Sequence, residues 1–335
     1  MRPTHIVTML LLAARLHGLA QEPAVPAPGG GPQPSQAGIS NGLIHARFYL
    51  PDSVNGYYRS TRFDWSGVMP SLEYKGHSYF GQWFPTYSPT LHDAIVGPVE
   101  SFSPLGYSDA AAGGSFVEIG VGRLTRPDSA GYSSFRYYPI RDGGVWEVKR
   151  SKTAMGFTQV LNSGDYRYVY SKTVSLVRGK PELVIAHRLH NTGSRSIETD
   201  VFDHNFFVTD SQRIAPGIGL RFPWALTTEQ ARGLDDLAAI HGDSILILRP
   251  LGERESVYAV LYGYGNTAAD YDIRLENHIT GAAVRIRADR PLSKLVYWGS
   301  VKTLCPEPYI HVHVAPGETF TWTLYYEFYT VNPHS

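Results

Sequence analysis

Apolar and polar residues alternate along most of the chain after residue 38, in short segments rich in Val, Ile, Thr, Tyr and Phe. Residues 166–177 form one such segment, which is followed by the turn-like sequence Arg178-Gly179-Lys180-Pro181. The next segment runs from Glu182 to His190 and closes at Asn191-Thr192-Gly193. A period of two residues predicts β-strands with one buried face. The same pattern predicts further strands at residues 244–248, 257–262, 283–288, 294–298 and 319–329.

The spacing of these segments predicts the fold class. Strands recur at intervals of roughly ten residues and are separated by Gly, Pro, Asn and Asp, a pattern typical of a β-sandwich. The one stretch with a helical pattern of interest is Thr227 to Ala239, where we expect a helix. We therefore expect an all-β protein.

The first twenty residues have the features of a secretory signal peptide. An arginine near the start is followed by the apolar run Ile6 to Ala14 and then by Gly18-Leu19-Ala20, whose small residues suit cleavage after Ala20. A membrane anchor would need about 20 continuous apolar residues, and Arg15 and His17 interrupt this run. We expect an exported protein, periplasmic or fully secreted, without a later membrane span.

Residues 21–38 contain five prolines and the run Gly29-Gly30-Gly31. This composition cannot build a core and favours an extended linker. Residues 39–335 are expected to form a single domain, because all-β domains commonly reach this size. Cys305 is the only cysteine, so no internal disulfide is available and stability must come from a large packed core.

The overall charge of the chain is balanced. Lys and Arg total 30, as do Asp and Glu, so electrostatics gives no reason to expect nucleic acid or an anionic membrane as a partner. A neutral partner such as a sugar is compatible with this balance. The sequence leaves the oligomeric state open.

Two aromatic-rich segments contain candidate acid and base residues. They are Asp203-His204-Asn205-Phe206-Phe207 and Cys305-Pro306-Glu307-Pro308-Tyr309. A histidine and a glutamate are the residue types that move protons in opposite directions at one sugar ring. Glu307 is hard to explain as packing, because a buried carboxylate costs several kcal/mol unless it is paired. A lone histidine in a strand is usually structural, so the case for His204 depends on its motif.

The stretch Leu183 to Phe207 resembles the aldose 1-epimerase (galactose mutarotase-like) superfamily. In that family a strand, a turn containing asparagine and a second strand lead into a His-x-Tyr-Phe type motif, whose histidine is the general acid. Here the turn is Asn191-Thr192-Gly193 and the motif is His204-Asn205-Phe206-Phe207. A weaker similarity begins at Phe63-Asp64-Trp65-Ser66-Gly67.

The C-terminal part is similar to the last segment of the same family. There a glutamate before a Pro-Gly-Glu-Thr turn is the general base. This chain has Cys305-Pro306-Glu307-Pro308 and then Ala315-Pro316-Gly317-Glu318-Thr319. The resemblance covers most of residues 39–335 and implies a large antiparallel β-supersandwich of the galactose mutarotase-like type.

The resemblance also implies a reaction, the interconversion of sugar anomers. Glu307 would take the proton of the anomeric hydroxyl while His204 protonates the ring oxygen. The ring opens, the C1–C2 bond rotates, and closure from the other face inverts the anomer. No metal or organic cofactor is implied, and the expected partner is a carbohydrate, either a monosaccharide or the end of a glycan.

Substrate-binding residues are less well marked. The family usually has a second histidine in a His-Gly pair, and this chain has His92-Asp93 instead, which makes His92 a candidate. Arg59, Arg62 and Arg123 are candidates for the sugar-binding arginine, and we favour Arg62 because it precedes Phe63-Asp64-Trp65.

Tryptophans and aspartates complete the list of candidates. Trp298 is expected to stack on a sugar face, as Trp83 and Trp224 could, although core filling is the default for a tryptophan. The family's hydroxyl-binding aspartate has no match in a recognisable motif. Asp235, Asp236 and Asp243 lie in the interval between the two motifs, and none of them is assigned this role.

Alternation places His311 and His313 on one face of a strand, a geometry that could hold a metal. No third ligand follows at a telling spacing, so a solvated or hydrogen-bonded pair is the preferred interpretation.

Two other functions remain open at this stage. A polysaccharide lyase would need a base such as His204 or a tyrosine, together with an arginine that neutralises a uronate carboxylate. A non-catalytic carbohydrate-binding protein would keep the fold without turnover. Fold alone does not decide among these functions.

Overall fold

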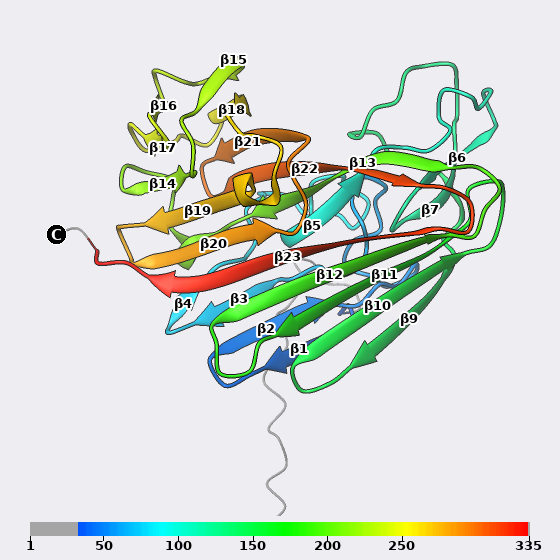
Figure 1. Ribbon diagram of the computed structural model, residues 1–335, viewed down its shortest axis with the longest axis horizontal. Coiled ribbons are helices and arrows are strands. Elements are labelled where there is room, and N and C mark those ends of the chain that lie inside the picture. Colours follow the sequence, from blue (N-terminus) through cyan, green and yellow to red (C-terminus); the bar gives the residue numbers. More distant parts are fainter. Residues whose placement is uncertain (1–32, 334–335) are drawn as a thin grey trace, which may run out of the picture.

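The computed structural model describes residues 33–333 (Figure 1). The expected signal peptide and the larger part of the expected linker lie outside the described residues, so export stays a prediction. The last residues of the expected linker belong to the fold, because the first strand, β1, spans Gln36–Ser40.

The strands of this part of the chain form four sheets, and every pair of neighbouring strands is antiparallel. The largest sheet has ten strands, in the spatial order β16 (Ala238–His241), β17 (Ser244–Ile247), β14 (Ile218–Arg221), β19 (Asp272–Asn277), β20 (Ala282–Ala288), β23 (Thr319–Thr330), β12 (Glu182–Asn191), β11 (Tyr168–Leu176), β10 (Ala154–Leu161) and β9 (Val145–Arg150).

The second sheet has six strands, in the order β15 (Thr227–Arg232), β18 (Ser256–Tyr262), β21 (Lys294–Ser300), β22 (Leu304–Val314), β13 (Ile197–Phe206) and β5 (Gly97–Phe102). Two small sheets complete the fold. One contains β1, β2 (Ile44–Tyr49), β3 (Ser71–Tyr74) and β4 (His77–Ser78), and the other contains β6 (Ser115–Glu118), β7 (Gly122–Thr125) and β8 (Ile140–Asp142). Two 3₁₀ turns are present, η1 (Thr209–Ser211) and η2 (Ala268–Asp270).

The strands predicted from alternation are confirmed, and the predicted helix is wrong. Residues 227–239 form β15, a turn and the start of β16. Gly233 and Asp235 have positive φ angles of 74° and 69°, which an α-helix does not contain. The pairing of β15 with β18 supplies backbone hydrogen bonds that outweigh a weak local preference for helix.

The two large sheets pack face to face and enclose the main core. Figure 1 shows β23, β12, β11, β10 and β9 side by side as a broad sheet, with β5, β13 and β22 above it in this view. A second apolar cluster combines β13 and β22 with the segments that cover the six-stranded sheet on its other side. It includes Phe63, Phe84, Val99, Phe206 and Cys305, all buried. Residues on β13 therefore contact a core on each face.

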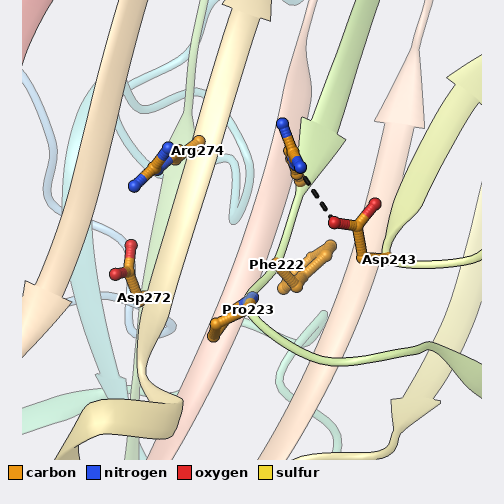
Figure 2. Close-up of a pocket in the computed structure, with 6 residues that line it drawn as sticks. Phe222, Pro223, Asp243, Asp272 and Arg274 are labelled. Atoms are coloured by element: carbon orange, nitrogen blue, oxygen red, sulfur yellow. Dashed lines mark hydrogen bonds and ion pairs between the residues drawn. The ribbon is translucent and has the colours of Figure 1, made fainter.

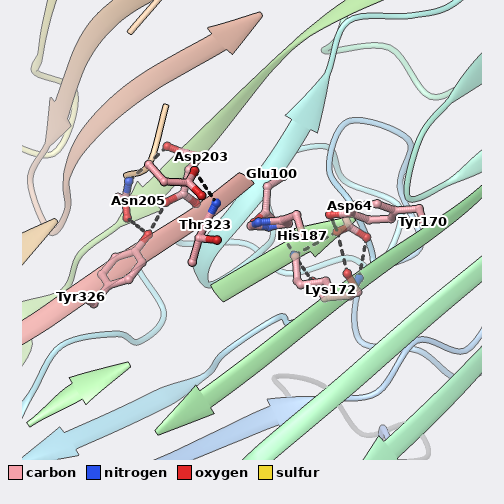
Figure 3. Close-up of polar contacts among 11 residues, drawn as sticks. Asp64, Glu100, Tyr170, Lys172, His187, Asp203, Asn205, Thr323 and Tyr326 are labelled. Atoms are coloured by element: carbon pink, nitrogen blue, oxygen red, sulfur yellow. Dashed lines mark hydrogen bonds and ion pairs between the residues drawn. The ribbon is translucent and has the colours of Figure 1, made fainter. Parts of the chain in front are cut away.

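A buried ionic network crosses the main core (Figure 3). Lys172 of β11 contacts Asp64 at 2.9 Å and makes a shorter ion pair with Glu100 of β5. His187 of β12 lies 2.6 Å from Glu100, and Tyr170 donates a hydrogen bond to Asp64. Burial alone would raise the pKa of Glu100, but the charges of Lys172 and His187 lower it to about 2. The network thus fixes β5 against the ten-stranded sheet.

Replacing Lys172 by Met is expected to lower the free energy of unfolding by about 3–5 kcal/mol, because two buried carboxylates lose their cation. Lys149→Met is the matched control, since its exposed ion pair with Glu147 is worth at most about 1 kcal/mol. Urea unfolding of both variants checks the difference. Equal losses in the two variants would contradict the role of the network.

Candidate active site

The pairing of β13 with β22 places His204 directly opposite Glu307. Two residues earlier Phe202 pairs with Tyr309, and the same register holds beyond the end of β13. His204 Nε2 is 3.3 Å from Glu307 Oε1, and the two side chains are only 4% and 9% exposed. Two candidates separated by about a hundred positions in the sequence therefore make direct contact.

The backbone around Glu307 is held by a side chain. Pro306 and Pro308 have no N–H group, so neither residue can donate to the ladder. Asn205 replaces a missing ladder contact, because its Nδ2 donates to the carbonyl oxygen of Pro306 at 3.1 Å. Tyr326 of β23 in turn donates to Asn205 Oδ1 at 2.8 Å. Figure 3 shows the contact between Tyr326 and Asn205. Because neighbouring residues of a strand point to opposite faces, Asn205 faces the main core and His204 the other side of β13.

The imidazole of His204 lies among aromatic rings. It stacks on Phe206 with centroids 3.8 Å apart, and it meets Phe63 and Trp298 in edge-to-face contacts with centroid separations of 5.6 Å and 6.1 Å. His204 Nδ1 is buried without a hydrogen-bond partner in the described structure. The ring therefore has one polar contact, through Nε2 to Glu307.

Burial shifts both groups towards their uncharged forms. It raises the pKa of Glu307 to about 7, against the opposing charges of Arg62 and Lys294. Burial, reinforced by the charge of Arg62, holds the pKa of His204 well below its usual range. At neutral pH a single proton shared by the pair thus resides mainly on Glu307.

Arg62, His92 and Asp93 form a cluster beside the pair. Arg62 makes a close ion pair with Asp93, and His92 Nδ1 is 2.9 Å from the other carboxylate oxygen of Asp93. The Arg62 guanidinium also lies 4.7 Å from the ring centres of Phe63 and Phe135. All three polar side chains are partly exposed. Their N–H and carboxylate groups are suitable for hydrogen bonds to sugar hydroxyls.

Two tryptophans contact the same region. Trp298 lies edge-on to His204 and to Trp83, whose centroid is 5.3 Å away. Trp83 stacks on Phe206 at 4.9 Å and donates its indole hydrogen to the carbonyl of Ile95. Both tryptophans are partly exposed, so they combine a packing role with accessible ring surface.

Other sequence candidates lie elsewhere. Arg123 is on β7, in the three-stranded sheet, where its charge helps to lower the pKa of Asp142. The positive charge of Arg59 favours the ionised forms of Asp52 and Tyr87. In residues 33–333 no contact joins either arginine to His204 or Glu307, so Arg62 is the arginine that the fold brings to the pair.

Trp224 and the unassigned aspartates also lie apart from the pair. The Trp224 indole donates to the carbonyl of Asp270. Asp236 pairs with Arg249, and Asp243 pairs with Arg221.

Sequence reasoning missed two charged groups of the site. Asp93 was visible only as the residue that replaces the glycine after His92, and the structure shows that it joins His92 to Arg62. Lys294 pairs with Tyr309 across β21 and β22, and its Nζ is 5.0 Å from the Tyr309 ring centre. Only the strand register, which the sequence does not reveal, could have placed Lys294 near Glu307.

His311 and His313 lie further along β22 than Glu307 and contact the start of β13. His311 Nδ1 lies 3.1 Å from Asp200 Oδ1, and His313 Nδ1 lies 3.8 Å from Glu198, with all four side chains about half exposed or more. Between residues 33 and 333 no group of three or more His, Cys, Asp or Glu side chains has a geometry suited to a metal ion. Nor does this part contain a helix with the length and hydropathy of a membrane span.

Comparison with known proteins gives matches in structure. No protein-family model matches the sequence, and no curated protein is significantly similar to it. The GalM/aldose epimerase homologue from C. elegans superposes with a TM-score of 0.54 at 13% identity, over 89% of this chain and 99% of that one. A galactose mutarotase-like protein from Clostridium acetobutylicum gives a TM-score of 0.54 at 11% identity, over 89% and 95%.

A galactose mutarotase-like protein from Lactobacillus casei ATCC 334 gives a TM-score of 0.52 at 13% identity, over 88% of this chain and 100% of that one. Identities this low establish the fold and leave the activity to the residues of the site. The chain has the galactose mutarotase-like fold, as the resemblance of its two motifs implied.

Proposed function

We propose that the protein interconverts the anomers of an aldose, with His204 as general acid and Glu307 as general base. The contact of 3.3 Å between the two side chains carries this proposal. The ring oxygen and the anomeric oxygen of a sugar are bonded to the same carbon. An acid and a base that act on these two atoms must therefore converge, as this pair does.

The proton balance of the pair fits ring opening and closure. The reactive form contains ionised Glu307 and protonated His204. Glu307 accepts the proton of the anomeric hydroxyl, the bond between C1 and the ring oxygen breaks, and His204 protonates that oxygen. The enzyme then holds protonated Glu307 and neutral His204, the form that burial favours. Closure on the other face of the aldehyde returns both protons by the reverse steps.

The surrounding residues would orient the sugar. Arg62 and His92 are held by Asp93, so their remaining N–H groups have fixed positions from which to donate to hydroxyls. Trp298 and Trp83 would present aromatic surface to the apolar face of the ring. The arrangement supports a carbohydrate as the partner and His92, Arg62 and Trp298 as its binding residues. Arg123 would contribute to sugar binding only from outside this cluster.

The activity is tested by NMR exchange between α and β anomers of a panel of aldoses. Wild-type protein should accelerate exchange for at least one sugar, and His204→Ala and Glu307→Gln should each reduce the rate about 10²-fold or more, since each removes a proton-transfer group. Glu198→Gln, at the exposed start of β13, and His313→Ala, at the exposed end of β22, are the matched controls and should retain the wild-type rate.

Full acceleration by either site variant would overturn the proposal. Absence of acceleration with every sugar would favour the two other functions. A polysaccharide lyase would then form an unsaturated uronide that absorbs in the ultraviolet, although Arg62 already pairs with a carboxylate of the protein. A non-catalytic binding protein would retain sugar affinity when His204 or Glu307 is replaced.

The rate should also depend on pH in a defined direction. The pair is reactive with one proton and loses it as the pH rises through the pKa of Glu307, about 7. We expect kcat/KM to fall roughly tenfold per pH unit well above pH 7. A pH series of the exchange rate at constant ionic strength measures this. A rate that stays constant or increases up to pH 9 would contradict the shared-proton scheme.

A further inference from the structure

A second site lies on the ten-stranded sheet, outside the acid–base pair and its neighbours. It is a cavity of about 280 Å³ lined by Arg221, Phe222, Pro223, Asp243, Asp272 and Arg274 (Figure 2). Its walls come from the end of β14, the start of β19 and the turn before β17. None of these residues contacts His204 or Glu307 in the described structure.

Two arginines of this cavity face each other across neighbouring strands. In the pairing of β14 with β19, Arg221 lies directly opposite Arg274. Like charges at directly opposite positions of an antiparallel pair destabilise the sheet unless an anion lies between them or beside them. The arrangement of counter-charges around the two guanidinium groups therefore decides what the cavity can bind.

The carboxylates of the cavity are already engaged by other contacts. Asp243 Oδ2 accepts a hydrogen bond from Arg221 Nε at 3.0 Å. Asp272 is held from the adjacent strand by Arg285, whose Nε lies 2.8 Å from Asp272 Oδ1 and whose Nη2 contacts the other oxygen. Arg274 has neither a carboxylate partner nor a hydrogen bond from its guanidinium among residues 33–333. Arg285 also approaches Glu327 at 3.9 Å, so within the described residues Arg274 is the lining cation without an anionic partner of its own.

The free donors are suited to an oxyanion. Arg221 uses only Nε for Asp243, which leaves its two terminal nitrogens available. Arg274 is partly buried and offers the whole planar fork of its guanidinium. Two such groups can hold a carboxylate or phosphate by charge-assisted hydrogen bonds. Phe222 and Pro223 add an apolar wall, and the volume is just below the range of about 300–1,000 Å³ for small-molecule sites, which suits a small ligand.

We propose that this cavity binds a small organic anion, whose carboxylate or phosphate group lies between Arg221 and Arg274. Recognition depends on Arg274 as the cation without an internal partner, and Arg221 contributes the opposite wall. The site does not depend on the acid–base pair, so it stands or falls separately from the proposed epimerase activity.

Trp224 provides a reporter for this site, because its ring centroid is 5.1 Å from that of Phe222. The experiment follows the indole N–H signal of Trp224 by NMR, assigned with Trp224→Phe, while inorganic phosphate or acetate replaces chloride at constant ionic strength and pH. A saturable shift with phosphate alone, acetate alone or both supports the proposal, and it distinguishes a phosphoryl from a carboxylate ligand. Absence of a saturable shift with either anion overturns it.

Variants test the assignment of the cation. Arg274→Gln should weaken the apparent affinity by about tenfold or more, the effect expected from losing one charge-assisted pair. Arg254→Gln removes one exposed arginine elsewhere and should leave the titration unchanged. Asp243→Asn should tighten binding, because it removes a competing anion from Arg221. Equal affinities for the wild type and Arg274→Gln would overturn the site.

Discussion

The antiparallel register between β13 and β22 is the constraint on which the site depends. It sets His204 opposite Glu307 at 3.3 Å on one face, while the other face carries Asn205 towards the carbonyl of Pro306. A slip of one residue would exchange the two faces and send the acid and base into the core. Because the flanking prolines weaken the ladder here, the Asn205 contact and the neighbouring strands have to maintain this register.

Both faces of β13 are buried, but the carboxylates near the two faces differ in the cations that surround them. On the inner face, Lys172 and His187 neutralise Glu100, which adjoins β13 through β5. On the outer face no Lys or Arg of residues 33–333 pairs closely with Glu307, and burial raises the pKa of its carboxyl to about 7. Paired cations hold Glu100 ionised, whereas burial without a close cation gives Glu307 a pKa at which it can gain and lose a proton near neutral pH. Burial likewise raises the pKa of Asp203, on the inner face, to about 8.

Much of the fold could be predicted from the sequence. Alternation located strands such as Glu182–Asn191 to within a residue or two, because one face of each is buried. It failed at residues 227–239, where cross-strand pairing and turn residues determine the structure. The motifs located His204 and Glu307. The roles of Asp93, Lys294 and the Lys172 network depend on contacts between segments distant in sequence, which a local pattern does not contain.

The central claim is that His204 and Glu307 act as one unit. A double-mutant cycle on the anomer exchange rate tests it most directly, with His204→Ala, Glu307→Gln and the double variant compared with the wild type. When two residues act in the same step, replacing either one removes the contribution of both. The double variant should therefore be about as slow as the slower single variant. Losses that multiply in the double variant would show two independent contributions and contradict the account.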